Sequence, residues 1–325
     1  MHDFNYNNID EASKSISSQI LKTPLVTSEY INKTLNARVY FKLENLQWTG
    51  SFKLRGATNK ILKLNSDQKK NGIVAYSSGN HAQAVAYASK LNGISAKIIM
   101  PKSAPKIKIE NTKKYGAKVI LYNTFYESRE EIGNKIANDE NRTLIKPYDD
   151  LDIIAGQGTS GKEIANELLN LNISPDIYLC CCGGGGLVAG TSTYLKYSFP
   201  NVKCYSVEPD NFDDTKISLE ENFIKPVKKN LTSICDALLA KQPGNLTFSI
   251  NKKILSKGLS VSDEEVKSTI IHLAENLKII VEPGGAVAAS ALLNNKIETN
   301  NKTIVVMISG GNIDNKLFSK IVSES

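Results

Sequence analysis

Four consecutive glycines, Gly183 to Gly186, are the residues with the clearest chemical signature in the sequence. They follow the apolar run Ile177–Cys182, which we interpret as a strand, and they precede Leu187, where a helical segment begins. A strand that runs into bare glycines and then into a helix presents backbone N–H groups to an anion such as a phosphate. A tight turn needs fewer than four glycines, so the sequence predicts an anion site at this loop.

Three phosphate-bearing ligands compete for the glycine loop. A nucleotide-binding P-loop requires Gly-Lys-Ser/Thr after the glycines, and Leu187-Val188 stands there instead. A dinucleotide-binding fingerprint is formally present as Gly184, Gly186 and Ala189, with Glu208 at the end of a later strand. An NAD-binding oxidoreductase is therefore an alternative. The third ligand is pyridoxal 5′-phosphate, which also requires a lysine elsewhere in the chain.

Lys53 is the candidate for that lysine. It lies between Gly50 and Gly56, and the preceding Phe52 offers a ring that can pack near a planar cofactor. A lysine that forms a Schiff base needs a pKa lowered by burial or by nearby positive charge. We expect Arg55 to contribute such a charge.

A second polar loop, Ser77-Ser78-Gly79-Asn80-His81, follows the predicted strand Ile73–Tyr76 and precedes an alanine-rich helix that ends at Gly93. Hydroxyl and backbone N–H groups at a helix N-terminus suit a carboxylate ligand. An ordinary N-cap serine is the alternative interpretation of the same residues.

Several other chemistries are excluded by residue type. The only histidines are His2, His81 and His272, and neither G-x-S-x-G nor H-E-x-x-H occurs, which argues against zinc enzymes and hydrolases. Three of the five cysteines are consecutive, Cys180 to Cys182, a spacing unsuited to a disulfide framework or a CxxC metal site. We expect reduced thiols in a cytoplasmic protein.

Alternating strands and helices must position these loops. This alternation predicts an α/β fold with mostly parallel sheets covered by helices. Two helices are expected to begin at capping boxes, Ser160 with Glu163 and Ser262 with Glu265. The strands are expected at Arg38–Leu43, Ile73–Tyr76, Ala96–Met100, Lys118–Tyr122, Thr143–Lys146, Ile177–Cys182, Lys203–Val207 and Thr303–Ile308.

The length of 325 residues predicts two lobes, yet no linker or internal repeat divides the chain. The second lobe is therefore expected as an insertion. Residues 71–150 hold four strand–helix alternations and form the predicted small domain, and residues 1–70 plus 151–325 form the large one. A small ligand is expected in the cleft between them.

Charge and hydropathy exclude several classes of partner. The net charge is +7, but only four basic residues are arginines, the residue type that makes bidentate contacts to phosphates and bases. We therefore expect no nucleic-acid partner. No apolar run approaches eighteen residues, so neither a signal peptide nor a membrane span is expected.

Several spaced motifs together give the sequence a family resemblance that covers most of the chain. It resembles the serine/threonine dehydratase and serine racemase family of fold-type II pyridoxal-phosphate enzymes. The resemblance implies the tryptophan synthase β-like architecture, with two open, twisted, mostly parallel sheets. The motifs that carry it are Ser51–Ala57, Ser77–His81, Ala155–Thr159, Gly183–Gly186, Val281–Pro283 and Ser309–Asn312.

The resemblance implies a set of cofactor contacts. Lys53 would hold the cofactor covalently and, once released, remove the α-proton of the substrate. Ser309 would contact the pyridine nitrogen, and a neutral hydroxyl there makes the ring a weaker electron sink that favours elimination over transamination. The remaining implied contacts are Phe52 beside the ring, Asn80 at the phenolic oxygen, Glu282, and a phosphate cup of Gly183, Gly184, Gly185, Gly186 and Leu187.

The resemblance also implies a substrate site, a metal and an assembly. The substrate carboxylate would be bound by Ser77, Ser78, Asn80 and His81, and Ser78 would be the proton donor on the face opposite Lys53. Many members hold Mg²⁺ or a similar cation at positions matching Glu208, the Phe212 carbonyl and Asp214. A homodimer is expected, and no regulatory domain is expected after Ser325.

The implied activity is deamination of L-threonine or L-serine to a 2-oxo acid and ammonia. Serine racemase and threo-3-hydroxyaspartate dehydratase are alternatives that use the same residues. Three departures from the family pattern, Trp48, Ala82 and the segment Cys235–Ala237, are expected to alter the pocket rather than to remove a catalytic group.

Overall fold

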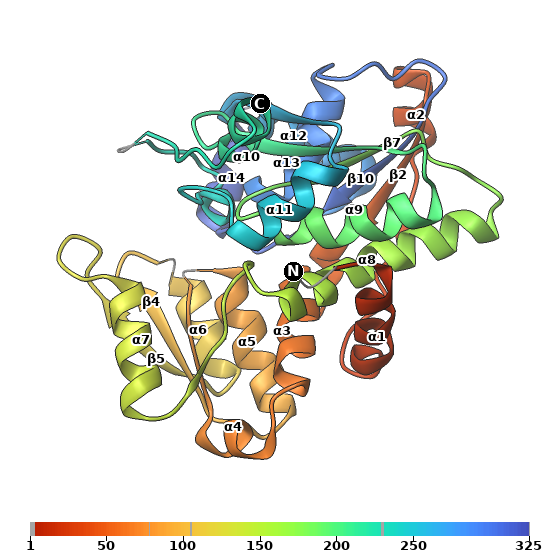
Figure 1. Cartoon of the computed structure of the whole chain (residues 1–325). Helices are drawn as coiled ribbons and strands as arrows, with labels where there is room; N and C mark the ends of the chain where they lie inside the picture. The colour runs from red at the N-terminus through yellow and green to blue at the C-terminus, as the bar shows by residue number, and fades with distance from the viewer. Residues whose placement is uncertain (1–3, 78, 105, 229–230, 325) are drawn as a thin grey trace.

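The computed structural model describes residues 4–324 except 78, 105 and 229–230. It contains two sheets flanked by helices (Figure 1). The larger sheet has six strands in the order β1-β2-β10-β7-β8-β9, and the smaller has four in the order β5-β4-β3-β6. Every pairing between these strands is parallel except that of β1 with β2. The predicted fold class is confirmed.

The strands have the following bounds: β1 Leu25–Val26, β2 Arg38–Leu43, β3 Ile73–Tyr76, β4 Ala96–Pro101, β5 Lys118–Tyr122, β6 Thr143–Leu144, β7 Ile177–Cys181, β8 Lys203–Pro209, β9 Lys257–Val261 and β10 Thr303–Ile308. All eight predicted strands are present, with end shifts of at most two residues. Two strands were not predicted from the sequence: β1, a two-residue edge strand, and β9, which contains Gly258.

The helices cover both sheets. They are α1 Tyr6–Ile16, α2 Glu29–Leu35, α3 Lys53–Leu62, α4 Ser66–Asn71, α5 Asn80–Leu91, α6 Lys106–Lys114, α7 Arg129–Asp139, α8 Leu151–Asn170, α9 Gly186–Ser198, α10 Asp214–Glu221, α11 Asn245–Ile254, α12 Asp263–Leu277, α13 Pro283–Leu293 and α14 Asn315–Ser323. Two 3₁₀ turns, η1 Glu44–Leu46 and η2 Asp236–Leu238, complete the described elements.

Hydrophobic side chains alternate between the two faces of the smaller sheet. Ile73 and Ala75 of β3 belong to the apolar core on the α5 side, whereas Val74 packs with Ile132 and Ile136 of α7 on the other side. In the larger sheet, all six residues of the central strand β10 are buried. A strand covered on both faces needs a continuous apolar run, which is why Thr303–Ile308 was recognisable in the sequence.

One predicted helix start is correct and the other is wrong. Ser262 and Glu265 form a capping box at the start of α12. Ser160 instead lies inside α8, whose N-cap is Asp150, and its hydroxyl donates a hydrogen bond to the Gln157 carbonyl at 2.9 Å. The local pattern was misleading because Glu163 is engaged in a long-range ion pair with Arg55.

The four strands between residues 71 and 150 build the whole of the smaller sheet. The core of that lobe, however, also includes Leu54, Ala57 and Ile61 of α3 and Ile153 of α8. The domain limits at residues 70 and 150 therefore stay a prediction. Figure 1 shows α3 beside α5 in the lobe of the smaller sheet, and α8 where the two lobes meet. Among the described helices, none is both long and apolar enough to cross a membrane.

Candidate active site

A cavity of about 780 Å³ is lined by residues from both lobes. It brings together most of the residues that the sequence analysis selected: Phe52, Lys53, Ser77, Asn80, His81, Gly183, Gly184, Gly185, Gly186, Leu187 and Ser309. Glu282 lies behind this wall, and Glu208, Phe212 and Asp214 lie elsewhere. Ser78, predicted as a proton donor and substrate ligand, falls outside the described residues.

The glycine loop is shaped to receive an anion. Thr247 Oγ1 donates to the Gly184 carbonyl at 2.6 Å, and Asn251 Nδ2 donates to the Gly185 carbonyl at 3.3 Å. Helix α9 begins at Gly186 without a side-chain cap, and within the described chain no acceptor takes the N–H groups of residues 184–187. These unpaired donors at a helix N-terminus fit a phosphate.

Glycine is required at two positions of this loop for different reasons. Gly185 has φ +91°, a conformation that side chains with a Cβ rarely adopt. At Gly184 a Cβ would lie 2.3 Å from the Tyr148 ring. Tyr148 therefore packs directly on the bare backbone, and the loop has no space for a side chain at residue 184.

Lys53 is the first residue of α3 and reaches the cavity wall. Its Nζ donates to the Pro147 carbonyl at 2.8 Å and lies 5.1 Å from the centroid of the Phe52 ring. Burial lowers the pKa of Lys53 to about 8, while Cys181 acts in the opposite direction. A pKa in this range leaves a useful fraction of neutral amine near pH 7 to 8, as a nucleophile or base requires.

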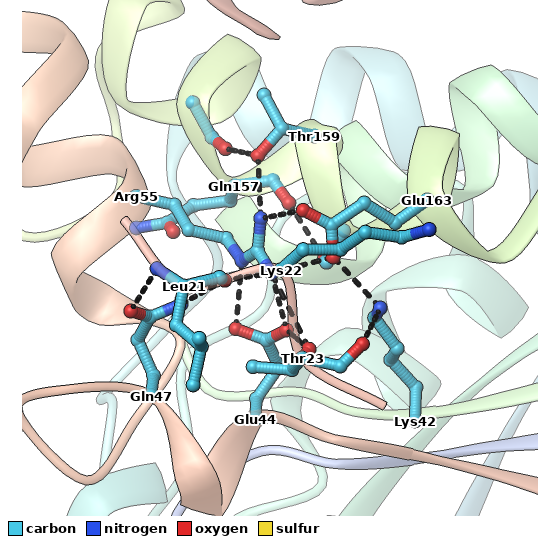
Figure 2. A network of polar contacts seen from close by, with 12 residues as sticks. Leu21, Lys22, Thr23, Lys42, Glu44, Gln47, Arg55, Gln157, Thr159 and Glu163 are labelled. Atoms are coloured by element: carbon cyan, nitrogen blue, oxygen red, sulfur yellow. Dashed lines mark hydrogen bonds and ion pairs between the residues drawn. The ribbon is translucent and has the colours of Figure 1, made fainter. Parts of the chain in front are cut away.

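Arg55 does not supply the positive charge expected beside Lys53. Its side chain is buried in an ion network (Figure 2), where it donates to Glu44 at 2.7 and 2.8 Å and to Glu163 at 2.7 and 2.8 Å. Lys42 also donates to Glu163, at 2.7 Å. Two carboxylates thus neutralise Arg55, and the low pKa of Lys53 results from burial.

The ion network anchors the helix that carries Lys53. It joins Lys42 of β2 and Glu44 of η1 to Arg55 of α3 and Glu163 of α8. Burial alone would lower the pKa of Arg55, but Glu44 and Glu163 reverse this effect and raise it. The network therefore depends on all of its charges being present.

Removing one partner from a buried ion pair leaves an uncompensated charge. We expect Arg55→Met to lower the free energy of unfolding by about 3 to 5 kcal/mol. Urea unfolding followed by circular dichroism measures this change, with Arg38→Met at an exposed position as the control. A loss below about 1 kcal/mol, the range of exposed ion pairs, would contradict an anchoring role.

The loop that precedes α5 presents hydrogen-bonding groups to the cavity. The Gly79 N–H donates to Ser77 Oγ at 3.2 Å, and α5 begins at Asn80 without a side-chain cap. His81 Nε2 lies 3.1 Å from the Ile145 carbonyl; because a carbonyl only accepts, Nε2 carries the proton. His81 Nδ1 is buried without a partner in the described chain and is left as an acceptor.

His81 is neutral at physiological pH. Burial lowers its pKa to about 3, and the charge of Lys53 lowers it further in the same direction. A neutral ring cannot attract a carboxylate by charge. The uncapped N–H groups at the start of α5 are better suited to that ligand, while Nδ1 suits a hydroxyl or ammonium group.

Asn80 is held by two side chains behind the cavity. Its Nδ2 donates to Glu282 Oε1, and its Oδ1 accepts from Asn312 Nδ2 at 2.8 Å. Burial raises the pKa of Glu282 to about 7. Glu282 was predicted as a cofactor contact and is not among the residues that line the cavity. Its contact with the cavity residue Asn80 is the hydrogen bond to Oε1, and the cofactor contact stays a prediction.

Ser309 lies just after β10 on the cavity wall, beside Cys181. The Phe52 N–H donates to the Ser309 carbonyl at 3.1 Å, and Ser51 forms a bridge with Gly310. These contacts join the end of β10 to the segment that carries Lys53.

The predicted metal residues form a separate, buried acidic group. The Glu208 carboxylate accepts from the N–H groups of Thr215 and Lys216 at 2.9 and 2.8 Å. Both Asp214 oxygens are buried and have no hydrogen-bond partner among the described residues. Burial raises the pKa of Asp214 to about 8, and burial together with Asp214 raises that of Glu208. Two such carboxylates fit a hard divalent cation.

The carboxylates do not make a complete coordination shell. The described residues contain no group of three or more His, Cys, Asp or Glu side chains that is arranged to hold a metal ion. A cation at Glu208 and Asp214 would therefore need the Phe212 carbonyl and water molecules as further ligands. The ligand set implied by the family resemblance therefore stays a prediction.

Several cavity residues were not selected from the sequence. They include Lys108, Arg129, Pro147 and Tyr148. Of these, Arg129 carried a usable signal, because arginine is scarce in this chain. Pro147 contributes only a carbonyl group, which no side-chain pattern reveals.

The fold and the site together define a class of cofactor-dependent enzyme. The chain belongs to the family described as pyridoxal-phosphate dependent enzymes, which it matches over residues 16–310. It is 40% identical over 319 residues to a serine racemase of Schizosaccharomyces pombe, covering 98% of this chain and 97% of that protein.

A second related sequence and a solved structure are also similar to this chain, and they have different named activities. An L-threo-3-hydroxyaspartate ammonia-lyase of Saccharomyces cerevisiae is 38% identical over 318 residues, covering 98% of this chain and 96% of that protein. The crystal structure of a threonine deaminase from T.th. superimposes with a TM-score of 0.90 and 35% identity, covering 95% of this chain and 99% of that one. The family match confirms pyridoxal phosphate as the cofactor over the NAD alternative. The assignment of its phosphate to the glycine loop stays a prediction.

Proposed function

We propose that this protein is a pyridoxal-phosphate dependent ammonia-lyase that converts L-threonine or L-serine to the 2-oxo acid and ammonia. The observation that carries the proposal is one cavity lined both by a half-buried lysine of lowered pKa, Lys53, and by the glycine loop with its uncapped N–H groups. The names of the relatives support a β-hydroxy amino acid as substrate.

The residues of the cavity fit the cofactor. The uncapped N–H groups of Gly184 to Leu187 would hold its phosphate, and Phe52, Asn80 and Ser309 would surround its ring. When bound, the cofactor withdraws electrons from the α-carbon of the substrate and so makes its proton acidic. Because Ser309 is a neutral partner, it would not keep the ring nitrogen protonated, which favours elimination.

The protein's own groups would then perform the proton transfers. Lys53 Nζ takes the α-proton, the loop from Ser77 to His81 holds the carboxylate, and the β-hydroxyl leaves with a proton as water. The lowered pKa of Lys53 makes it available as a base near neutral pH. The released product reacts with water to give the 2-oxo acid and ammonia.

The test is a comparison of substrates. The protein loaded with pyridoxal phosphate is incubated with L-threonine, L-serine and L-threo-3-hydroxyaspartate, and 2-oxo acid and ammonia are measured. Equimolar release from threonine or serine supports the proposal. Release from neither contradicts it. Chiral analysis of serine in the same samples measures racemisation, for which the implied donor is Ser78.

A second candidate substrate is threo-3-hydroxyaspartate. Arg129 lines the cavity with Tyr76, and its guanidinium carbon lies 5.4 Å from the centroid of the Tyr76 ring. An arginine suits the second carboxylate of such a substrate. If this substrate is preferred, Arg129→Met will raise KM for hydroxyaspartate much more than KM for threonine.

We also propose that Glu208, the Phe212 carbonyl and Asp214 bind Mg²⁺ or a similar cation. The two partnerless oxygens of buried Asp214 support this site. We expect saturating Mg²⁺ to raise the free energy of unfolding by about 2 to 3 kcal/mol over that in chelator, because ligands stabilise the state that binds them. Thermal unfolding measures the difference.

Asp214→Asn is the matching variant for the metal site. It should unfold at the same temperature with Mg²⁺ and with chelator. Equal midpoints for the unaltered protein in the two conditions would refute the site, as would an undiminished Mg²⁺ effect in the variant.

We further propose a cytoplasmic homodimer. The five cysteines are all free and buried, in keeping with a reducing compartment. The dimer rests on the family resemblance. Light scattering should give about twice the chain mass of 35.6 kDa; a mass equal to that of one chain would disprove the dimer.

A further inference from the structure

Lys108 connects the two lobes beside the cavity. It lies on α6, in the lobe of the smaller sheet, and its Nζ is 2.6 Å from Asp236 Oδ2 of η2. The same Nζ is 3.9 Å from Glu282 Oε2, next to the start of α13. Both carboxylates belong to the segment of the chain that accompanies the larger sheet. One lysine therefore faces two acidic partners across the boundary between the lobes.

The ion pair lies next to the loop that is proposed to bind the substrate. A Cβ on Gly79 would be 3.5 Å from Lys108 Nζ, so the ammonium group lies against Gly79, directly before α5. Lys108 and Asp236 also both line the cavity. The ion pair is therefore part of the cavity wall and does not lie on a remote surface.

Because the Lys108 ammonium is buried, its ion pairs depend on how the two lobes are placed relative to each other. The Lys108 side chain is only 5% exposed, whereas that of Asp236 is 41% exposed. A buried ammonium is stable only where carboxylates compensate for its lost hydration. Separation of the lobes would remove both partners at once. The contact therefore favours the arrangement of the two lobes seen here.

Lys108 also influences the residues behind the cavity. Burial raises the pKa of Glu282, and the charge of Asp236 raises that pKa further. The charge of Lys108 acts in the opposite direction and lowers the pKa of Glu282. Glu282 Oε1 is the acceptor of the hydrogen bond from the Asn80 amide. Lys108 and Asn80 both belong to the lobe of the smaller sheet. Lys108 therefore supports Asn80 indirectly, through Glu282 of the other lobe.

We propose that Lys108 and Asp236 form an interlobe clasp that holds Gly79 and Asn80, at the start of α5, in place for substrate binding. The substrate part of this inference rests on the proposed lyase function. Lys108 and Asp236 are positioning residues: they act through Gly79 and Asn80 and do not touch the reacting atoms. Loss of the clasp weakens substrate binding more than it slows the chemical step.

A double-mutant cycle tests the clasp on the holoenzyme. Lys108→Met and Asp236→Asn are each expected to raise KM by about tenfold with kcat changed less than about threefold, and the double variant should be no worse than the worse single variant. Lys108→Arg should restore most of the loss. Lys113→Met, on the same helix and exposed, is the matched control with unchanged KM.

A second readout does not depend on activity. Trp48 is the only tryptophan, and its ring centroid lies 6.2 Å from that of Tyr87 of α5 in an edge-on contact. Acrylamide should quench Trp48 fluorescence more strongly in Lys108→Met than in the unaltered protein, and Lys113→Met should show no difference. This measurement remains informative if the proposed lyase function fails.

The outcomes separate the two proposals. Absence of lyase activity together with increased quenching in Lys108→Met rejects the proposed function and supports the clasp. With an active enzyme, increased quenching and a non-additive rise in KM support both. Unchanged quenching in Lys108→Met, or KM effects that multiply in the double variant, overturns the clasp.

Discussion

Lys53→Ala is expected to lower kcat for 2-oxo acid release by about 10⁴-fold, because it removes both the covalent attachment of the cofactor and the base that takes the α-proton. The fold should survive, since among the described residues Lys53 Nζ makes a single hydrogen bond, to the Pro147 carbonyl, and the α3 anchor is Arg55. Steady-state kinetics measure the loss, and circular dichroism checks the fold.

The matched control is Lys63→Ala at the other end of α3. Lys63 is 40% exposed and pairs with Asp152, so its removal should leave kcat within about twofold, as expected for an exposed ion pair. A folded Lys53→Ala variant that retains more than about one per cent of the activity would contradict the assignment of Lys53 as the base.

Gly184→Ala is expected to weaken pyridoxal-phosphate binding by about 100-fold or more, equivalent to roughly 3 kcal/mol. The new Cβ would lie 2.3 Å from the Tyr148 ring, so either Tyr148 or the loop must move. Such a shift turns the N–H groups of the glycine loop away from the phosphate. A spectroscopic titration of the cofactor-free protein measures the dissociation constant.

Gly116→Ala provides the control for a general effect of replacing glycine. Gly116 has φ +85° but no atom within 4 Å of an added Cβ, so the variant is strained and uncrowded. It should lose about 1 kcal/mol of stability and no cofactor affinity. Equal affinity of Gly184→Ala and the unaltered protein would show that the loop does not bind the phosphate as proposed.

The scaffold was predictable because buried parallel strands leave strong local patterns. Continuous β-branched runs such as Thr303–Ile308 can only be covered on both faces. The wrongly predicted helix start arose because a local pattern was interpreted without its distant partner. Ser160 and Glu163 match a capping box, but Glu163 instead neutralises Arg55, 108 residues away in sequence. No short pattern reveals such a partner.

Much of the candidate site was predictable because its motifs follow parallel strands. Ser77 comes after β3, Gly183 after β7 and Ser309 after β10. The carboxyl ends of β7 and β10 lie at one edge of the larger sheet, and β3 ends at the corresponding edge of the smaller sheet. The carboxyl ends of parallel strands are where α/β proteins place their ligands. The contributions of Pro147 and Tyr148 depend on tertiary packing alone, so the sequence did not show them.

The most direct test of the central claim is to locate the cofactor on the chain. The purified protein is loaded with pyridoxal phosphate, reduced with borohydride to fix the cofactor to its lysine nitrogen, digested and mapped by mass spectrometry. The structure predicts stoichiometric modification of the peptide that contains Lys53. Modification of a different lysine, or none, would contradict the account.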